Sequence, residues 1–204
     1  MQHEPLTTTA GPAGAIRRTQ AERSATTCAA LTDAAIDVLI HRGWAAVTAI
    51  EVCNRAGVTR GAFHHHYDAL PALLADALRR LYADMAQPSR PPPADLPGLL
   101  DVTWAAIGSP RFKAVIEAWL AMANDPALRE QIGPVVAQFS ALVSPGTMPA
   151  ILTSPRHRDF YLLARETMLG LALGRATGRC RPLRHERAVL AQLSAAAAEL
   201  DDRG

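Results

Sequence analysis

Hydrophobic side chains recur at three- and four-residue intervals along most of the chain, which is the spacing of one face of an α-helix. The clearest stripe, ALTDAAIDVL at residues 30–39, is followed by Gly43, a typical helix terminator. Alternating β-branched residues, which mark strands, are nearly absent. The sequence therefore predicts an all-α fold. We expect about nine helices, near residues 19–41, 48–57, 59–66, 69–85, 95–107, 110–123, 125–143, 156–177 and 183–201.

Proline and glycine divide these helices into a head and a body. The run PSRPPP at residues 88–93 cannot continue a helix, so it marks a stiff junction. The Thr-, Pro- and Gly-rich start is typical of a disordered tail. We expect four segments: a tail over residues 1–16, a head over 17–67, a connecting helix and proline-rich junction over 68–93, and a body over 94–204.

Composition narrows the class of protein. Of the 204 residues, 49% are hydrophobic, as in a folded protein with a core, and the net charge of +2 is too small to indicate a polyanion partner by itself. No apolar run is long enough to cross a bilayer, and the N-terminus lacks a secretion signal. Cys28, Cys53 and Cys180 lie far apart, which favours a reducing compartment over a disulfide framework. We expect a cytoplasmic protein; the redox activity of Cys180 stays open.

The stretch TAIEVCNRAGVTRGAFHHHY, residues 48–67, has the pattern of two short helices joined by a tight turn. Thr48 is a candidate N-cap with Glu51 as its capping-box partner, Thr59 is a second N-cap, and Gly57 tolerates the positive φ of the turn. The apolar residues of one face point inward: Val52, Val58, Phe63 and Tyr67. The others face outward: Thr59, Arg60, Gly61, Ala62, His64 and His65. A short helix that presents Arg and His beside small residues can enter a DNA major groove.

From Arg17 to Leu78 the chain closely resembles the TetR family of bacterial repressors. The resemblance rests on RRTQAER, DAAIDVLIHRGWAAVT and EVCNRAGVTRGAFHHHYDALPALLADAL, in matching order and spacing. It implies a three-helix DNA-binding head and a homodimer whose recognition helices enter successive major grooves. It also implies a divergent body that binds a small effector and then releases the DNA.

The resemblance also implies roles for individual residues. Arg60 would contact bases, most simply guanine, and Gly61 and Ala62 would let the backbone approach them. Contacts to the DNA backbone are implied for Thr48, Thr59, His64 and His66, with His65 beside them on the outward face. Arg17 and Arg18 would follow the minor groove or the phosphates as a flexible arm, or form only a solvated tail.

Two residues depart from the family pattern. Leu70 stands where the family usually has a phosphate-contacting Lys, and Asp68 places an acid close to the expected phosphates. Both should weaken DNA affinity and its salt dependence.

The run His64-His65-His66 does not predict a metal site, because consecutive helical side chains point about 100° apart and cannot share one ion. No hydrolase motif or phosphate-binding glycine loop is present. We therefore expect no metal, no cofactor and no enzymatic activity.

Aromatic and Met residues gather in the body, where they indicate either core packing or an apolar effector pocket between helices. The candidate pocket residues are Trp104, Phe112, Trp119, Met122, Phe139 and Met168. Few charges interrupt these helices, so an apolar or aromatic effector is favoured.

The last two helices carry a seam that favours a partner helix pair and thus a four-helix bundle in a homodimer. The candidate interface residues are Phe160, Leu163, Thr167, Leu171, Leu190, Leu193 and Ala197. Packing of the same stripe within one chain is the alternative.

Together these patterns favour a transcriptional repressor that leaves a palindromic operator when an effector binds. An effector-independent regulator or an activator, whose body only dimerises, is one alternative, and ligand-induced release from DNA separates the two. A ligand-binding helical protein whose head has lost DNA affinity is the other, and it would select no DNA.

Overall fold

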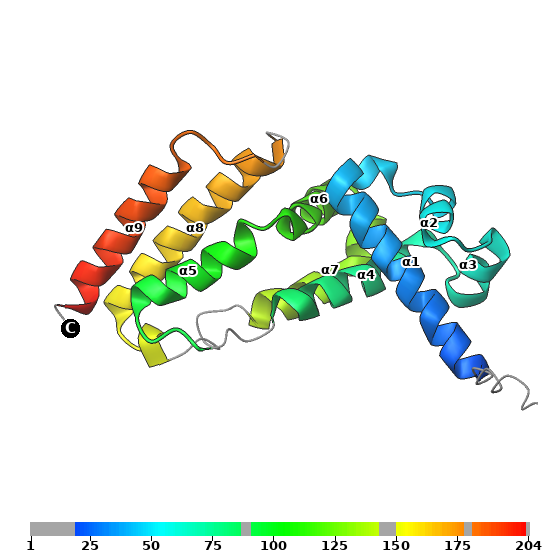
Figure 1. Ribbon diagram of the computed structural model, residues 1–204, viewed down its shortest axis with the longest axis horizontal. Coiled ribbons are helices and arrows are strands. Elements are labelled where there is room, and N and C mark those ends of the chain that lie inside the picture. The colour runs from blue at the N-terminus through cyan, green and yellow to red at the C-terminus, as the bar shows by residue number, and fades with distance from the viewer. Residues whose placement is uncertain (1–18, 87–90, 143–149, 178–180, 203–204) are drawn as a thin grey trace, which may run out of the picture.

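A computed structural model describes residues 19–86, 91–142, 150–177 and 181–202. Within these ranges the chain forms nine α-helices and two short 3₁₀ turns, without a strand (Figure 1). The head contains α1 (Gln20–Arg42), η1 (Trp44–Ala46), α2 (Ala49–Ala56) and α3 (Arg60–His66), and α4 (Leu70–Met85) follows it. The body contains α5 (Leu96–Ile107), α6 (Pro110–Asn124), α7 (Pro126–Leu142), η3 (Ala150–Leu152), α8 (Pro155–Thr177) and α9 (Glu186–Asp201). The predicted all-α fold is confirmed, and the two 3₁₀ turns are additions to it.

A threonine hydroxyl caps the N-terminus of each of the three α-helices of the head. The Thr19 hydroxyl accepts a hydrogen bond from the Glu22 N–H, and the Glu22 carboxylate accepts one from the Thr19 N–H, which completes a capping box. Thr48 accepts from the Glu51 N–H at 3.1 Å, as predicted. The reciprocal bond from Glu51 is replaced, because its carboxylate pairs with Arg42 of α1 at 2.5 Å. The Glu51 carboxylate therefore binds a residue of another helix instead of the Thr48 N–H that the sequence predicts.

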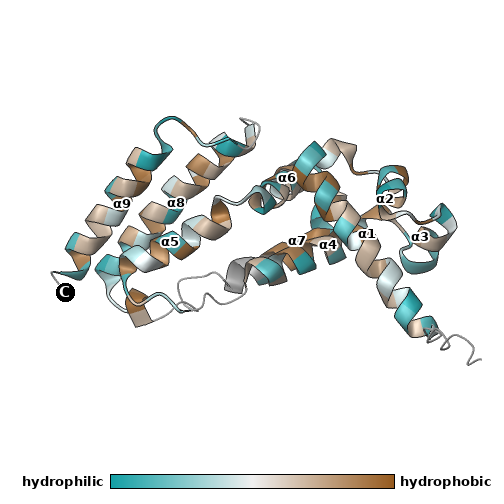
Figure 2. Ribbon diagram, in the orientation of Figure 1, coloured by the Kyte–Doolittle hydropathy of each residue, from teal (hydrophilic) through white to brown (hydrophobic). Residues whose placement is uncertain are grey.

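Two groups of buried side chains hold the helices together. The larger core joins α1, α2, α3, α4, α6 and α7 and includes Ala172 of α8, so the head shares its core with part of the body. Figure 2 shows hydrophobic residues concentrated where α4 and α7 lie together. The smaller core joins α5, η3, α8 and α9 at the other end of the molecule. Trp104 of α5 packs against both cores.

None of the described helices is long and apolar enough to cross a membrane. The predicted tail, with Arg17 and Arg18, lies outside the described residues, as do Cys180 and the side chain of Phe139.

Candidate nucleic-acid interface

Helices α2 and α3 pack through apolar residues around a glycine turn. Gly57 ends α2 in the left-handed conformation with φ +67°, as the sequence predicts. Val52, Cys53 and Phe63 are almost fully buried between the helices, and the Phe63 and Tyr67 rings lie 5.9 Å apart. Burial raises the pKa of the Cys53 thiol, an effect that the nearby Arg60 only partly opposes. Cys53 is therefore a small packing residue in a protonated state.

One surface of α3 is left open by this packing. Arg60, Gly61, His64 and His65 are exposed, together with the cap residue Thr59. A Cβ added at Gly61 would meet only the Thr59 hydroxyl, at the ordinary contact distance of 3.8 Å. The fold therefore does not require glycine at this position. Any need for a small residue here comes from a molecule outside the protein.

His66 has a different environment from its two neighbours. It is half-buried, and its Nδ1 lies 3.5 Å from the hydroxyl of Ser24 in α1. The His65 and His66 rings lie 5.0 Å apart in an edge-to-face arrangement. The part of the chain that the structure describes contains no group of three or more His, Cys, Asp or Glu residues arranged to hold a metal ion. The contact between Ser24 and His66 was not predicted, because the two residues are 42 positions apart.

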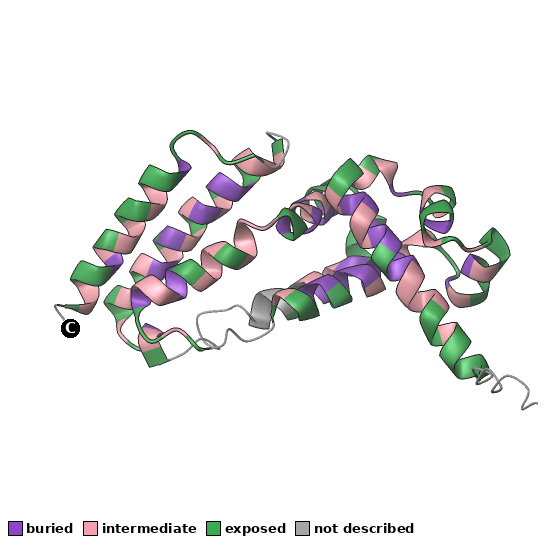
Figure 3. Ribbon diagram, viewed as in Figure 1, coloured by how far each residue is buried: buried purple, intermediate pink, exposed green. Residues whose placement is uncertain are grey.

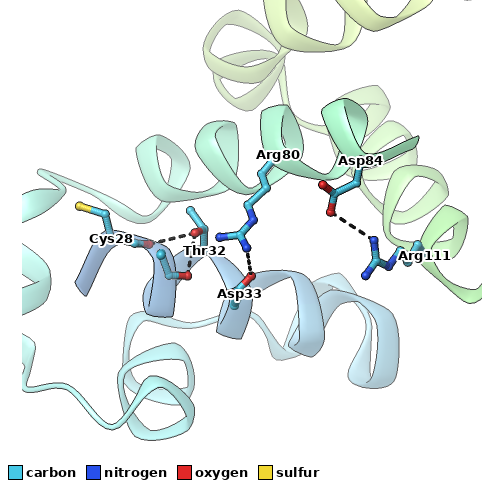
Figure 4. Close-up of polar contacts among 7 residues, drawn as sticks. Cys28, Thr32, Asp33, Arg80, Asp84 and Arg111 are labelled. Carbon is cyan, nitrogen blue, oxygen red and sulfur yellow. Dashed lines mark hydrogen bonds and ion pairs between the residues drawn. The ribbon is translucent and has the colours of Figure 1, made fainter. Parts of the chain in front are cut away.

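The arginines of the head fall into two groups. Arginines of the first group, with one of the adjoining α4, are paired with acids: Arg42 with Glu51, Arg55 with Asp37, and Arg80 of α4 with Asp33 of α1. Figure 4 shows the last of these pairs beside the Asp84–Arg111 pair, which joins α4 to α6.

Arg60 and Arg23 are exposed and, among the described residues, have no acid within ion-pair distance. Among the described residues, the arginines of the head without an acid partner therefore lie on α3 and near the start of α1. Arg23 was not predicted as a functional residue. Its position directly after the capping box at the start of α1 could have indicated it.

Tyr67 fixes the end of α3 to α4. Its hydroxyl donates a hydrogen bond to the Asp76 carboxylate at 3.2 Å, and burial together with this acid raises the pKa of Tyr67 well above its usual range. Leu70, at the start of α4, is half-buried and packs against the larger core. The expected phosphate-contacting position is thus used for packing, while Asp68 beside it is exposed.

The candidate pocket residues of the body are divided between the two cores. Phe112 and Met122 are buried in the larger core, where the Phe112 and Trp119 rings meet edge to face at 5.6 Å. Met168 is buried in the smaller core, and Trp104 lies between the two. Burial raises the pKa of Tyr82 of α4 to about 12, an effect that the nearby Trp119 side chain only partly opposes. These contacts support the core-packing alternative for several members of the set.

A small cavity of about 30 Å³ opens beside the turn between α5 and α6. Phe112 and Lys113 of α6 line it together with Arg175 of α8. The Arg175 guanidinium lies 4.8 Å from the centre of the Trp104 ring, donates to the Gly108 carbonyl at 2.6 Å, and forms a two-bond ion pair with Glu186. Sequence reasoning found neither this cavity nor the Arg175–Glu186 pair.

The candidate interface residues are also divided. Leu171 and Ala197 are buried within the chain, whereas Leu163 is 62% exposed. Phe160, Thr167, Leu190 and Leu193 are half-buried. The outer surface of α8 and α9 carries further exposed apolar residues that the sequence analysis missed: Leu173, Ala188, Ala191, Ala195 and Ala198. Figure 3 shows the outer side of α9 mostly exposed or half-buried.

Comparison with known proteins agrees with this geometry. Residues 31–77 match the family model of the bacterial regulatory proteins of the tetR family. The chain is 31% identical over 150 residues to the HTH-type transcriptional regulator CymR of Pseudomonas putida, a match covering 70% of this chain and 74% of CymR. A transcriptional regulator from Rhodococcus has a similar fold, with a TM-score of 0.64, 21% identity and coverage of 84% of this chain and 96% of that one.

The multidrug binding protein EbrR, solved with proflavin, gives a TM-score of 0.51 at 25% identity, covering 82% of this chain and 99% of EbrR. The chain therefore belongs to the tetR family of bacterial regulatory proteins, which are DNA-binding transcriptional regulators and not enzymes.

Proposed function

We propose that the protein is a transcriptional repressor that binds a palindromic operator as a homodimer and leaves it when a small molecule binds the body. The observation that carries this proposal is the exposed surface of α3, where Arg60 has no acid partner among the described residues and stands beside Gly61, which the fold does not require. A free guanidinium beside an unobstructed backbone is suited to guanine O6 and N7 in a major groove.

Other residues of the head would position this helix. Thr48 and Thr59 are exposed N-caps, His64 and His65 are exposed, and Arg23 adds positive charge on α1. Phosphate contacts by such residues supply affinity and register rather than sequence preference. A protein that binds the bacterial chromosome in this way acts in the cytoplasm.

The outer surface of α8 and α9 supports a homodimer. Leu163 and Leu173 of α8 are 62% and 46% exposed, and four alanines follow one side of α9 at helical spacing. Small side chains allow helices to approach closely, and two α8–α9 pairs would form a four-helix bundle across a two-fold axis. This dimer would present two α3 helices to one palindrome.

The body supports an apolar or aromatic effector. Trp104 lies at the boundary between the two cores, where a displaced side chain would open space for an apolar group. EbrR, which is similar in fold, was solved with proflavin, an aromatic molecule.

One observation favours an effector-independent regulator or activator as a second candidate. The cavity of about 30 Å³ holds only one or two water molecules, whereas ligand sites usually measure about 300–1,000 Å³. If the body only dimerises, operator binding will not respond to aromatic compounds of any charge.

Selection of genomic DNA fragments by the purified protein near physiological salt tests the proposal. Arg60→Ala should lose about 1–3 kcal/mol per half-site and relax sequence preference. Arg55→Ala is the matched control, because Arg55 is also an exposed arginine of the head but is paired with Asp37. Wild type and the control should recover the same palindrome. Equal selectivity of all three proteins would overturn the role of Arg60, and no enrichment by wild type would overturn DNA recognition itself.

A further inference from the structure

The C-terminal end of α1 is held by two side chains of α6. The Lys113 ammonium donates to the Leu39 carbonyl at 3.4 Å, and the Glu117 carboxylate accepts from the Trp44 N–H at 3.0 Å. Lys113 and Glu117 also pair with each other at 3.1 Å. The Leu39 carbonyl also accepts a hydrogen bond from the Gly43 N–H at 3.2 Å, so the ammonium adds a positive charge at the C-terminal end of the helix, where cations are favourable. The body therefore supplies a polar clamp, formed by Lys113 and Glu117, for the end of the longest head helix.

Gly43 lets the clamp close on the backbone. It is buried and has φ +78°, a conformation that side chains disfavour. A Cβ at this position would stand 2.9 Å from a Glu117 oxygen, closer than real Cβ contacts. The carboxylate thus lies directly against the chain where α1 passes into η1. The positive φ favours glycine here, and a Cβ would displace the Glu117 carboxylate from the backbone.

The clamp is more shielded from water than the neighbouring ion pair of α6. The side chains of Lys113 and Glu117 are 16% and 31% exposed, compared with 57% and 46% for Arg111 and Asp84. Exposed pairs contribute little because water and salt screen them, while shielded contacts hold a defined geometry. The clamp is therefore suited to fixing an angle between helices.

The other head helices, α2 and α3, come directly after the C-terminal end of α1 that the clamp holds. Helix α1 packs against α2, α3 and α4, and Ser24 near its other end contacts His66 of α3. On the body side, Lys113 lines the cavity that Arg175 also lines. Arg175 in turn holds the Gly108 carbonyl at the end of α5. The clamp thus lies between α1, which contacts the recognition helix, and the cavity beside the α5–α6 turn.

We propose that Lys113 and Glu117 are positioning residues that set the angle between head and body, and through it the half-site spacing that the dimer accepts. This inference rests on the proposed function, because it requires a dimer that reads two half-sites. Loss of the clamp leaves the DNA-contacting surface of α3 intact and frees the two heads to adopt other separations.

The test measures operator spacing preference in Lys113→Met and Glu117→Ala. Binding is titrated on the selected palindrome, on versions with one base pair added or removed between half-sites, and on a single half-site. Wild type should prefer the native spacing sharply. Both variants should lose about five- to tenfold on the native palindrome, show a flattened spacing preference, and keep the half-site affinity of wild type.

Arg111→Gln is the matched control, since it removes an ion pair of the same helix that reaches α4 instead of α1. It should keep the wild-type spacing preference. Equal loss on half-site and palindrome in the clamp variants would show a merely destabilised head and overturn the proposal. An unchanged spacing preference would overturn it too.

Amide exchange gives a readout that needs no DNA. The Trp44 N–H should exchange faster in Glu117→Ala than in wild type, because its acceptor is gone. Unchanged exchange would show that the clamp does not hold in solution. Failure of wild type to select any palindrome, by contrast, counts against the proposed function and leaves the exchange experiment to decide on the clamp.

Discussion

The head and the α5–α8–α9 end of the molecule are built around two different cores, a larger and a smaller one. The larger core extends from α1–α3 into α4, α6 and α7 and includes Ala172 of α8, whereas the smaller core is formed by α5, η3, α8 and α9. The helices proposed to bind DNA thus share their core with α6, and most buried residues of the helices proposed to dimerise belong to the smaller core. The two cores meet at Trp104, at the α5–α6 turn and at the contacts of α6 with α8.

The largest expected effect comes from removing a central side chain of either core. Phe63→Ala should cost about 3–5 kcal/mol of stability and Met168→Ala about 2–5 kcal/mol, because each side chain is almost fully buried. Amide exchange should rise mainly in α1, α2 and α4 for Phe63→Ala, and mainly in α5, α8 and α9 for Met168→Ala. The same exchange pattern in both variants would show a single cooperative core.

A smaller effect is expected at the Arg175–Glu186 pair of the dimerisation end. Hydrogen bonds from Arg175 are the main cause that lowers the pKa of the buried Glu186 carboxyl below its ordinary value of 4.5. A lowered pKa stabilises the fold above that ordinary value, and the contribution is lost as the pH falls through the lowered one. Glu186→Gln should therefore be less stable than wild type near neutral pH, by up to about 3 kcal/mol.

The stability difference between wild type and Glu186→Gln should narrow as the pH falls below 4.5, because wild type then loses the same interaction. Thermal unfolding over that range measures it. A difference that stays constant with pH would show that the ion pair contributes nothing to the smaller core.

The smallest effect is expected at Asp68, an exposed acid near the predicted phosphate contacts. Asp68→Asn should raise operator affinity about two- to fivefold at low salt, and the gain should shrink as salt is added. Asp84→Asn, which removes an exposed acid at the far end of α4, should change affinity little. Equal gains from both variants would point to overall charge instead of a local contact.

Local patterns predicted most of the fold and the outward surface of α3. The nine α-helices of the described residues follow from hydrophobic spacing with caps such as Thr48 and Thr59, since these signals lie within a few residues of one another. Contacts between distant segments were not predictable in this way. Lys113 meets Leu39 across 74 positions, and Glu117 meets Trp44 across 73. These contacts depend on how α6 crosses α1, which side-chain spacing along one helix does not fix.

In the body, residue type predicted which side chains are buried but not which core they join. Large apolar side chains predict burial, and Phe112, Met122 and Met168 are buried. They do not predict which core each one joins, so the candidate pocket set is spread over two cores. Likewise, the seam predicted for the last two helices did not separate Ala197, buried within the chain, from the exposed alanines beside it.

Because α1 is long and the clamp holds one end of it as a pivot, a small change in angle there moves the other end of the helix by a larger distance. At 23 residues and about 1.5 Å per residue, the helix is about 34 Å long, with Lys113 and Glu117 at one end and the contact to His66 at the other. A tilt of about 5° at the pivot displaces the far end by about 3 Å over that length. Half-sites lie about 34–36 Å apart, so the same tilt in both protomers changes the separation of the two recognition helices by up to about 6 Å, nearly two base-pair steps of about 3.4 Å. An adjustment of atomic size in the body is thereby magnified at the DNA.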